Sequence, residues 1–225
     1  MNLYQHHTDR EIRAVLQESA KLTYDAQCNL LRELKVRALG MPTQDLEKHI
    51  EETEAAIDNL KYLKDLGFTY HQDAITQMIT VKRRRTAIVM DVVAIFLGLL
   101  LFVAGLVYFW LLMAMFFGNN EFTLTKLFAY TLMIAAGMIG FRMLAGIDRF
   151  LDYISFVLEQ SGTTVKLKKG GIKEIQKMDT TSLKIHQEEE ELILRAGEIE
   201  IMRCTADNLV HRKTLEALLQ KLTEN

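Results

Sequence analysis

The stretch VVAIFLGLLLFVAGLVYFWLLMAMFF, residues 92–117, contains no charged side chain. These 26 residues would extend about 39 Å as a helix, whereas roughly 20 apolar residues are enough to cross the hydrocarbon core of a bilayer. A surface helix of a soluble protein keeps one polar face, and this stretch has none. It therefore predicts a transmembrane helix, and its excess length predicts tilt or partial exposure at the interface.

A second apolar stretch follows at residues 127–147 and carries one charge, Arg142. Its length again matches one crossing of a bilayer. Only residues 118–126 separate it from the first stretch, and they are mostly polar. A connection this short predicts that the two helices are antiparallel neighbours, a hairpin with spans at about residues 88–117 and 127–147.

The orientation of the hairpin is predicted from the basic residues that flank it. The run Lys82, Arg83, Arg84 and Arg85 precedes the first span, and the connection between the spans carries only Lys126. The positive-inside rule therefore predicts a multi-pass protein of the cell membrane with both termini in the cytoplasm. The same run is also suited to binding anionic lipid head groups, and the two roles are compatible.

Small residues recur within the two spans. Ala94 and Gly98 lie four residues apart, as do Ala136 and Gly140, and Gly105 follows Gly98 by two helical turns. Small residues at this spacing let helix backbones approach closely in lipid. The faces that they form are expected to pack either against each other within the hairpin or against a second subunit.

Two charges, Asp91 and Arg142, lie near the cytoplasmic ends of the predicted spans. Each side chain is long enough, or near enough to the boundary, to reach the interface by itself. An ion pair between them, within or between subunits, is the second interpretation, and an ion or proton pathway is the third.

Residues 1–80 predict a helical cytoplasmic domain. Thr8 and Glu11 have the spacing of a capping box, and Gly40 and Pro42 are expected to end a helix that begins near Tyr24. A third helix is expected over residues 44–66. A fourth is expected to begin at Thr69 and to run into the basic run.

The second span is expected to continue beyond the membrane as a helical stalk over residues 148–160. Apolar residues continue at alternating spacings of three and four, as in a coiled coil. This stripe consists of Leu144, Ile147, Leu151, Ile154 and Leu158. It is expected to pack on the N-terminal helices or on a parallel copy in a homo-oligomer.

Residues 163–225 predict a small α+β cytoplasmic module. Residues 192–194 and 199–201 alternate around a turn at residues 195–198 and predict a β-hairpin. An amphipathic helix is expected over residues 208–222, and an all-helical form of residues 183–203 stays open. The predicted fold class is therefore mainly α: a helical domain at 1–80, a transmembrane hairpin with its stalk at 81–160, and the module at 163–225.

No motif in the sequence predicts catalysis. The chain has no HExxH, CxxC, P-loop or GxSxG pattern, and its two cysteines, Cys28 and Cys204, are far apart. The formal net charge of −2 gives no reason to expect a nucleic acid as partner. We therefore expect no cofactor, no metal ion and no enzymatic activity.

These features together predict a non-enzymatic scaffold or interaction subunit. Its expected partners are the lipid bilayer and either further copies of itself or another membrane protein. The alternative is a pore or channel-forming subunit, or a membrane effector, that is gated by its cytoplasmic domains.

Overall fold

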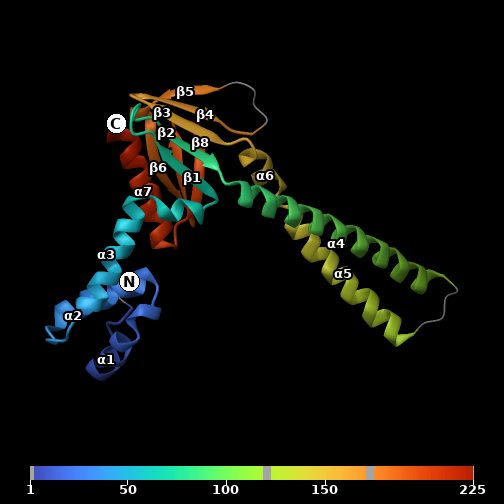
Figure 1. Cartoon of the computed structure of the whole chain (residues 1–225). Helices are drawn as coiled ribbons and strands as arrows, with labels where there is room; N and C mark the ends of the chain where they lie inside the picture. Colours follow the sequence, from blue (N-terminus) through green and yellow to red (C-terminus); the bar gives the residue numbers. More distant parts are fainter. Residues whose placement is uncertain (1–2, 119–122, 171–174, 225) are drawn as a thin grey trace. The chain divides into compact units, whose positions relative to one another are not determined.

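The computed structural model describes residues 3–118, 123–170 and 175–224. Its chain divides into two compact units, each assembled from separate segments (Figure 1). The first unit comprises Met1–Thr80, Glu159–Lys166 and Lys177–Asn225. The second comprises Val81–Leu158 and Leu167–Gln176.

In the first unit, four helices from the N-terminal and C-terminal parts of the chain pack together. They are α1 (Asp9–Gln17), α2 (Tyr24–Arg37), α3 (Gln44–Asp58) and α7 (Leu209–Glu224). Contacts link α1 to α2, α2 to α3, and α7 to both α2 and α3. Their apolar faces enclose one core, made of Tyr4, Ile12, Tyr24, Leu30, Leu34, Leu46, Ile50 and Ile57.

Local sequence explains where the first of these helices begin and end. The capping box predicted before α1 is confirmed: Thr8 N donates to Glu11 Oε2 over 2.7 Å, and Thr8 Oγ1 accepts from Glu11 N over 3.4 Å. The bond from the Thr8 backbone is the main cause that lowers the pKa of the Glu11 carboxyl, and a bond that Thr8 Oγ1 donates to Glu11 Oε2 acts in the same direction. Thr23 caps α2, which ends before Ala38 at φ 49°.

A three-stranded antiparallel sheet completes the first unit, formed by β6 (Leu183–Glu188), β7 (Glu191–Ala196) and β8 (Ile199–Thr205). In β7 and β8, Ala196 is opposite Ile199, which confirms the predicted β-hairpin. Helix α7 packs against the sheet. Residues 183–203, for which the sequence left a helical form open, are therefore mostly strands.

A second antiparallel sheet has five strands in the order β1-β2-β3-β4-β5. The strands are β1 (Phe68–Gln72), β2 (Ile79–Arg83), β3 (Val157–Ser161), β4 (Thr164–Lys168) and β5 (Gln176–Asp179). Short 3-10 turns occupy Ser19–Lys21, Lys61–Lys64 and Thr180–Ser182.

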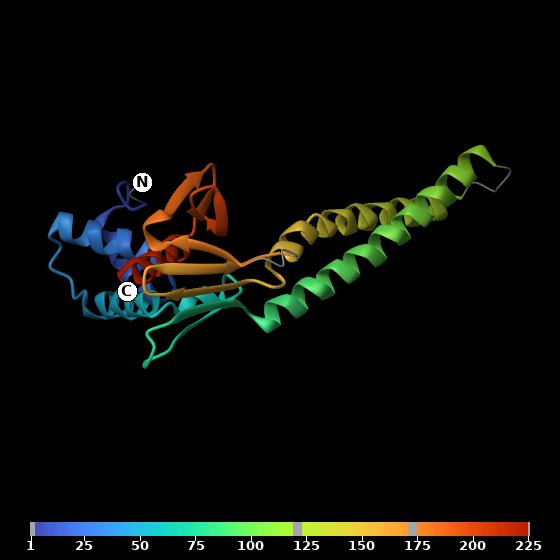
Figure 2. The same cartoon turned by 90° about the horizontal axis from the view of Figure 1, so that it is seen from above.

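The second unit contains the long hairpin. Helix α4 (Arg85–Phe117) has 33 residues and α5 (Leu124–Leu144) has 21, and both are long and apolar enough to cross a membrane. Figures 1 and 2 show them side by side and antiparallel. The short helix α6 (Ile147–Tyr153) follows and contacts α4.

The predicted fold class, mainly α, is wrong, because helices and two antiparallel sheets are mixed. One error lies at residues 68–83, where β1 and β2 replace the expected fourth helix of the N-terminal domain. Phe68, Thr69 and Tyr70 are β-branched or aromatic and favour a strand, as do Ile79 and Val81. Thr69 and Gln72 have the spacing of a helix capping box, but strand pairing in the sheet is more stable here than the helix that this spacing predicts.

The predicted stalk helix over residues 148–160 is also wrong. Helix α5 ends at Leu144, α6 ends at Tyr153, and β3 begins at Val157. Gly146 separates the two helices, and the aromatic and β-branched residues after α6 favour a strand. Of the expected stripe, Ile147 and Leu151 lie in α6, Ile154 follows it, and Leu158 is buried in β3.

Candidate functional site

Glycines set the distance between α4 and α5. A β-carbon added to Gly105 would lie 2.5 Å from the Cα of Gly137. Further along, a β-carbon on Gly140 would lie 2.6 Å from the carbonyl oxygen of Gly98. Only glycine permits backbones this close, so the two helices are in direct backbone contact at both levels.

The structure thus places three of the five predicted small residues, Gly98, Gly105 and Gly140, inside the hairpin. Ala94 and Ala136 are half-buried. The fourth glycine of the contact, Gly137, was missed by sequence reasoning, which grouped small residues four apart. The sequence does contain a pattern that indicates this contact. Gly98 and Gly105 lie in the first apolar stretch and Gly137 and Gly140 in the second, and antiparallel helices can bring them together in pairs.

The same contacts fix which residues of the two helices lie at one level. Gly98 is opposite Gly140 and Met143, so the end of α5 at Leu144 lies close to the level of Gly98. Helix α4 begins at Arg85, which lies about 20 Å further along its axis at 1.5 Å per residue. The first third of α4 therefore extends beyond α5.

The outer surface of the hairpin is apolar and uncovered. In the most apolar stretch of each helix, only 11% of the residues are buried. Trp110 is 74% exposed and Phe128 is 72% exposed. A core helix of a soluble protein can match the length and composition of α4, but it is mostly buried, whereas these two helices are not.

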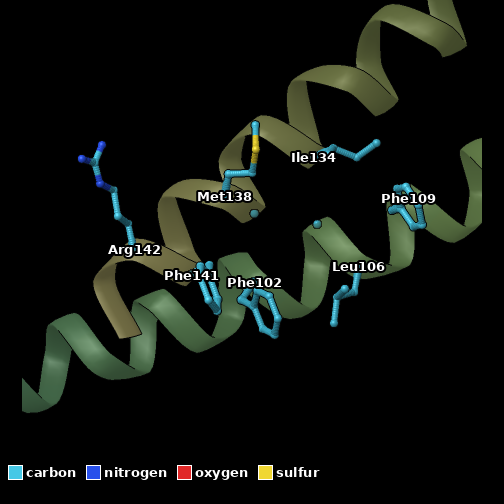
Figure 3. Close-up of a pocket in the computed structure, with 9 residues that line it drawn as sticks. Phe102, Leu106, Phe109, Ile134, Met138, Phe141 and Arg142 are labelled. Atoms are coloured by element: carbon cyan, nitrogen blue, oxygen red, sulfur yellow. The ribbon is translucent and has the colours of Figure 1, made fainter. Parts of the chain in front are cut away.

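An apolar groove lies on one face of the helix crossing. Its volume is about 550 Å³, within the range of small-molecule sites. Figure 3 shows side chains from both helices along it. The lining residues are Phe102, Gly105, Leu106 and Phe109 from α4, and Ile134, Gly137, Met138, Phe141 and Arg142 from α5.

Arg142 is the charged residue that lines the groove. It lies two residues before the end of α5, its side chain is exposed, and it turns away from α4 (Figure 3). Within the chain it is not paired with Asp91: the Asp91 carboxylate accepts a hydrogen bond from Arg83 Nη2 over 2.7 Å. Asp91 lies on the part of α4 that extends beyond α5, and this separates the two residues along the axis.

The four residues of the basic run differ in exposure. Lys82, Arg84 and Arg85 are exposed at the junction of β2 and α4. Arg83 is different, because only 9% of its side chain is exposed and it pairs with Asp91. One of the four residues that the sequence assigned to topology or lipid head groups thus holds the start of α4 to the end of β2.

A cluster around Tyr153 was missed by sequence reasoning. The guanidinium of Arg83 lies 5.7 Å from the ring centroid of Tyr153, and Lys169 Nζ lies 4.8 Å from it. Lys169 also lies 3.8 Å from the Asp152 carboxylate. Two cations thus share one buried aromatic ring, an arrangement that no sequence spacing indicates.

Polar groups in the first unit also meet around Tyr24. Its hydroxyl donates to Glu54 Oε1 over 2.9 Å and accepts from Lys213 Nζ over 2.6 Å. Burial raises the pKa of the Tyr24 hydroxyl well above its usual range, and Cys28 and Glu54 act in the same direction. This bond network links α2, α3 and α7.

Across residues 3–118, 123–170 and 175–224, no group of three or more histidine, cysteine, aspartate or glutamate residues is arranged to hold a metal ion. Cys28 and Cys204 are free thiols.

Comparison of the chain with protein-family models, with curated proteins and with solved structures finds no match.

Proposed function

We propose that the chain is a two-span integral membrane protein of the cell membrane. The α4–α5 hairpin anchors it, both ends of the chain are cytoplasmic, and the first unit is a non-enzymatic interaction module. The hairpin would keep this module at the membrane surface, where it meets further copies of the chain or another membrane protein.

The observation that carries the proposal is the uncovered apolar surface of the hairpin. Monomeric soluble proteins seldom expose a contiguous apolar patch of more than a few hundred Å². Here two antiparallel helices hold each other through glycine backbones and turn their large side chains outward. Lipid is the solvent that suits such a surface, since the backbone polar groups between the first and last turns of a helix are bonded to one another.

The interaction surface is expected on the first unit. The glycines that suggested self-association are occupied by the α4–α5 contact. The stripe that suggested a coiled-coil stalk is interrupted, because its residues lie in α5, in α6, just after α6 and in β3. Neither feature supports an oligomer through the spans. The pore alternative needs a polar path, and Asp91 is already bound by Arg83, so anchoring is the better supported role.

Sided labelling tests the anchoring role. The variants Gln5→Cys, Thr123→Cys and Gln187→Cys, made with Cys28→Ser and Cys204→Ala, place single thiols at exposed positions near the N-terminus, at the hairpin turn and in the C-terminal part. We expect a membrane-impermeant maleimide to label only Thr123→Cys in intact cells, and all three after lysis. Release of the protein by alkaline carbonate, or labelling of Gln5→Cys in intact cells, would contradict the proposal.

The interaction role is tested by the mass of the purified protein. We expect a homo-oligomer, or a second protein that co-purifies in stoichiometric amount, both in detergent and in nanodiscs. A monomer without a partner in both media would remove the interaction role and leave the anchor intact.

A further inference from the structure

We propose that the groove on the α4–α5 hairpin binds one acyl chain of an anionic phospholipid, whose phosphate is held by Arg142. This inference rests on the proposed function, because the groove meets lipid only if the hairpin lies in a bilayer.

The shape of the groove suits a single chain. Gly105 and Gly137 lack side chains, so the floor is backbone at the helix crossing. Phe102 and Phe109 from α4 and Phe141 from α5 lie along its length (Figure 3). From Arg142 to Ile134 the groove follows α5 for about 12 Å at 1.5 Å per residue. A flexible apolar chain fills a groove of this kind without leaving a void.

The depth of Arg142 suits a phosphate. Helix α5 has 21 residues and extends about 31 Å, close to the roughly 30 Å of a hydrocarbon core. Arg142 is therefore near one boundary, from which its long side chain reaches the head-group region. Arginine is the side chain best suited to bind phosphate through two parallel hydrogen bonds.

Charge favours a lipid over a second copy of the chain. Among the described residues, Arg142 has no acidic partner, and Asp91 is the one acidic residue of α4 and α5. Asp91 is bound to Arg83. A second copy placed on the groove by a two-fold axis would set Arg142 against its own counterpart, which costs free energy. An anionic head group supplies the missing negative charge.

Trp110 provides a built-in reporter. It is the single tryptophan of the chain, it is 74% exposed, and it follows Phe109 at one end of the groove. The full chain is reconstituted in two sets of phosphatidylcholine vesicles. One set contains brominated phosphatidylglycerol and the other contains brominated phosphatidylcholine, at the same mole fraction and with the bromine in mid-chain. We expect the quenching of Trp110 to give an affinity for brominated phosphatidylglycerol that is about fivefold higher than that for brominated phosphatidylcholine. This factor corresponds to the attraction between one cation near the membrane surface and an anionic lipid.

Two pairs of variants separate the groove from general charge. Arg142→Gln should abolish the selectivity, whereas Lys126→Gln, which removes a charge near the opposite end of α5, should retain it. Met138→Phe should reduce the selectivity by filling the groove. Ile139→Phe should not, because Ile139 is 61% exposed, much like Met138 at 65%, but lies outside the groove lining.

Native mass spectrometry of the chain should also show one retained anionic phospholipid per chain, lost in Arg142→Gln. Equal quenching by the two brominated lipids would overturn the inference. So would a dimer that Met138→Phe dissociates, because a second copy would then occupy the groove. Neither result would contradict the anchoring role of the hairpin. Failure of the chain to enter vesicles at all would overturn the proposed function.

Discussion

Two arginines, Arg37 and Arg83, join separate segments of the chain through their side chains. Arg37 donates hydrogen bonds to Glu33, Asp9 and the backbone oxygen of Tyr4, and so fastens the N-terminal segment to α2. The bond to Glu33 is the main cause that raises the pKa of Arg37. Arg83 has the same role in the second unit, where it joins β2 to α4 through Asp91. The bonds of Arg37 to Asp9 and Tyr4, and the bond of Arg83 to Asp91, are not indicated by helical i,i+4 spacing.

The variant Asp91→Asn tests the bond of Arg83. It removes the negative charge of the carboxylate that Arg83 binds, and the Arg83 side chain is only 9% exposed, so we expect a loss of about 1–2 kcal/mol in the free energy of unfolding. Asp148→Asn is the matched control, because Asp148 is exposed at the start of α6. Thermal unfolding in detergent measures both, and equal midpoints for the two variants would show that the Arg83–Asp91 pair contributes nothing.

The two cysteines should differ in reactivity because one is buried. Burial raises the pKa of the Cys204 thiol from 9.0 to about 11, and the Glu191 and Glu216 carboxylates act in the same direction. Because the thiolate is the nucleophile, a shift of two pKa units makes alkylation of Cys204 about a hundredfold slower than that of an ordinary thiol at pH 8. Iodoacetamide labelling followed by peptide mass analysis measures this, with Cys28→Ser to isolate the slow site.

The same pKa has a consequence for stability. Between pH 9 and about pH 11, the folded chain keeps the Cys204 proton while the unfolded chain loses it. The unfolded state then binds fewer protons, so stability falls as pH rises through this window and is unaffected by this group below pH 9. Cys204→Ala should flatten that part of the pH profile. Rapid labelling of Cys204 at pH 8 in the folded chain would contradict both expectations.

At the scale of the elements, local features could be predicted and non-local ones could not. The hairpin of α4 and α5 follows from length and hydrophobicity, and the capping box of α1 follows from two residues three apart. β1 and β2 were missed because a strand is stabilised by its neighbours in the sheet, and β2 pairs with β3, more than 70 residues later. The groove depends on how two helices cross, so neither helix alone reveals it.

The helix crossing provides a test at this scale. In Gly105→Ala the added methyl group would lie 2.5 Å from the Cα of Gly137, so the backbones must separate. We expect a loss of about 1–3 kcal/mol from this overpacking. Gly146→Ala is the control, since its new methyl group would meet only Met143 O at 3.4 Å. The midpoint of thermal unfolding in detergent should be lower for Gly105→Ala and unchanged for Gly146→Ala. A lower midpoint for Gly146→Ala than for Gly105→Ala would exclude this helix crossing.

At the scale of the whole molecule, the proposed membrane role predicts where a bilayer would meet the hairpin. Helix α5, with 21 residues, matches the hydrocarbon thickness, whereas α4, with 33, exceeds it. The glycine contacts place the end of α5 close to the level of Gly98, so the excess of α4 lies at its start. We therefore expect the part of α4 before about Gly98 to lie in the head-group or aqueous region, although Val89, Met90 and Val93 are apolar.

Single cysteines on the outer face of the hairpin measure this boundary. Met90→Cys, Val103→Cys and Leu132→Cys replace side chains that are 68%, 49% and 60% exposed, so protein packing hides none of them. In vesicles, a water-soluble maleimide should label Met90→Cys and should not label the other two, since a thiol reacts only as the solvated thiolate. In detergent-free denaturant all three should react. Protection of Met90→Cys would mean that a strongly tilted α4 is immersed from its first turns, and Arg142 would then lie too deep to reach a head group.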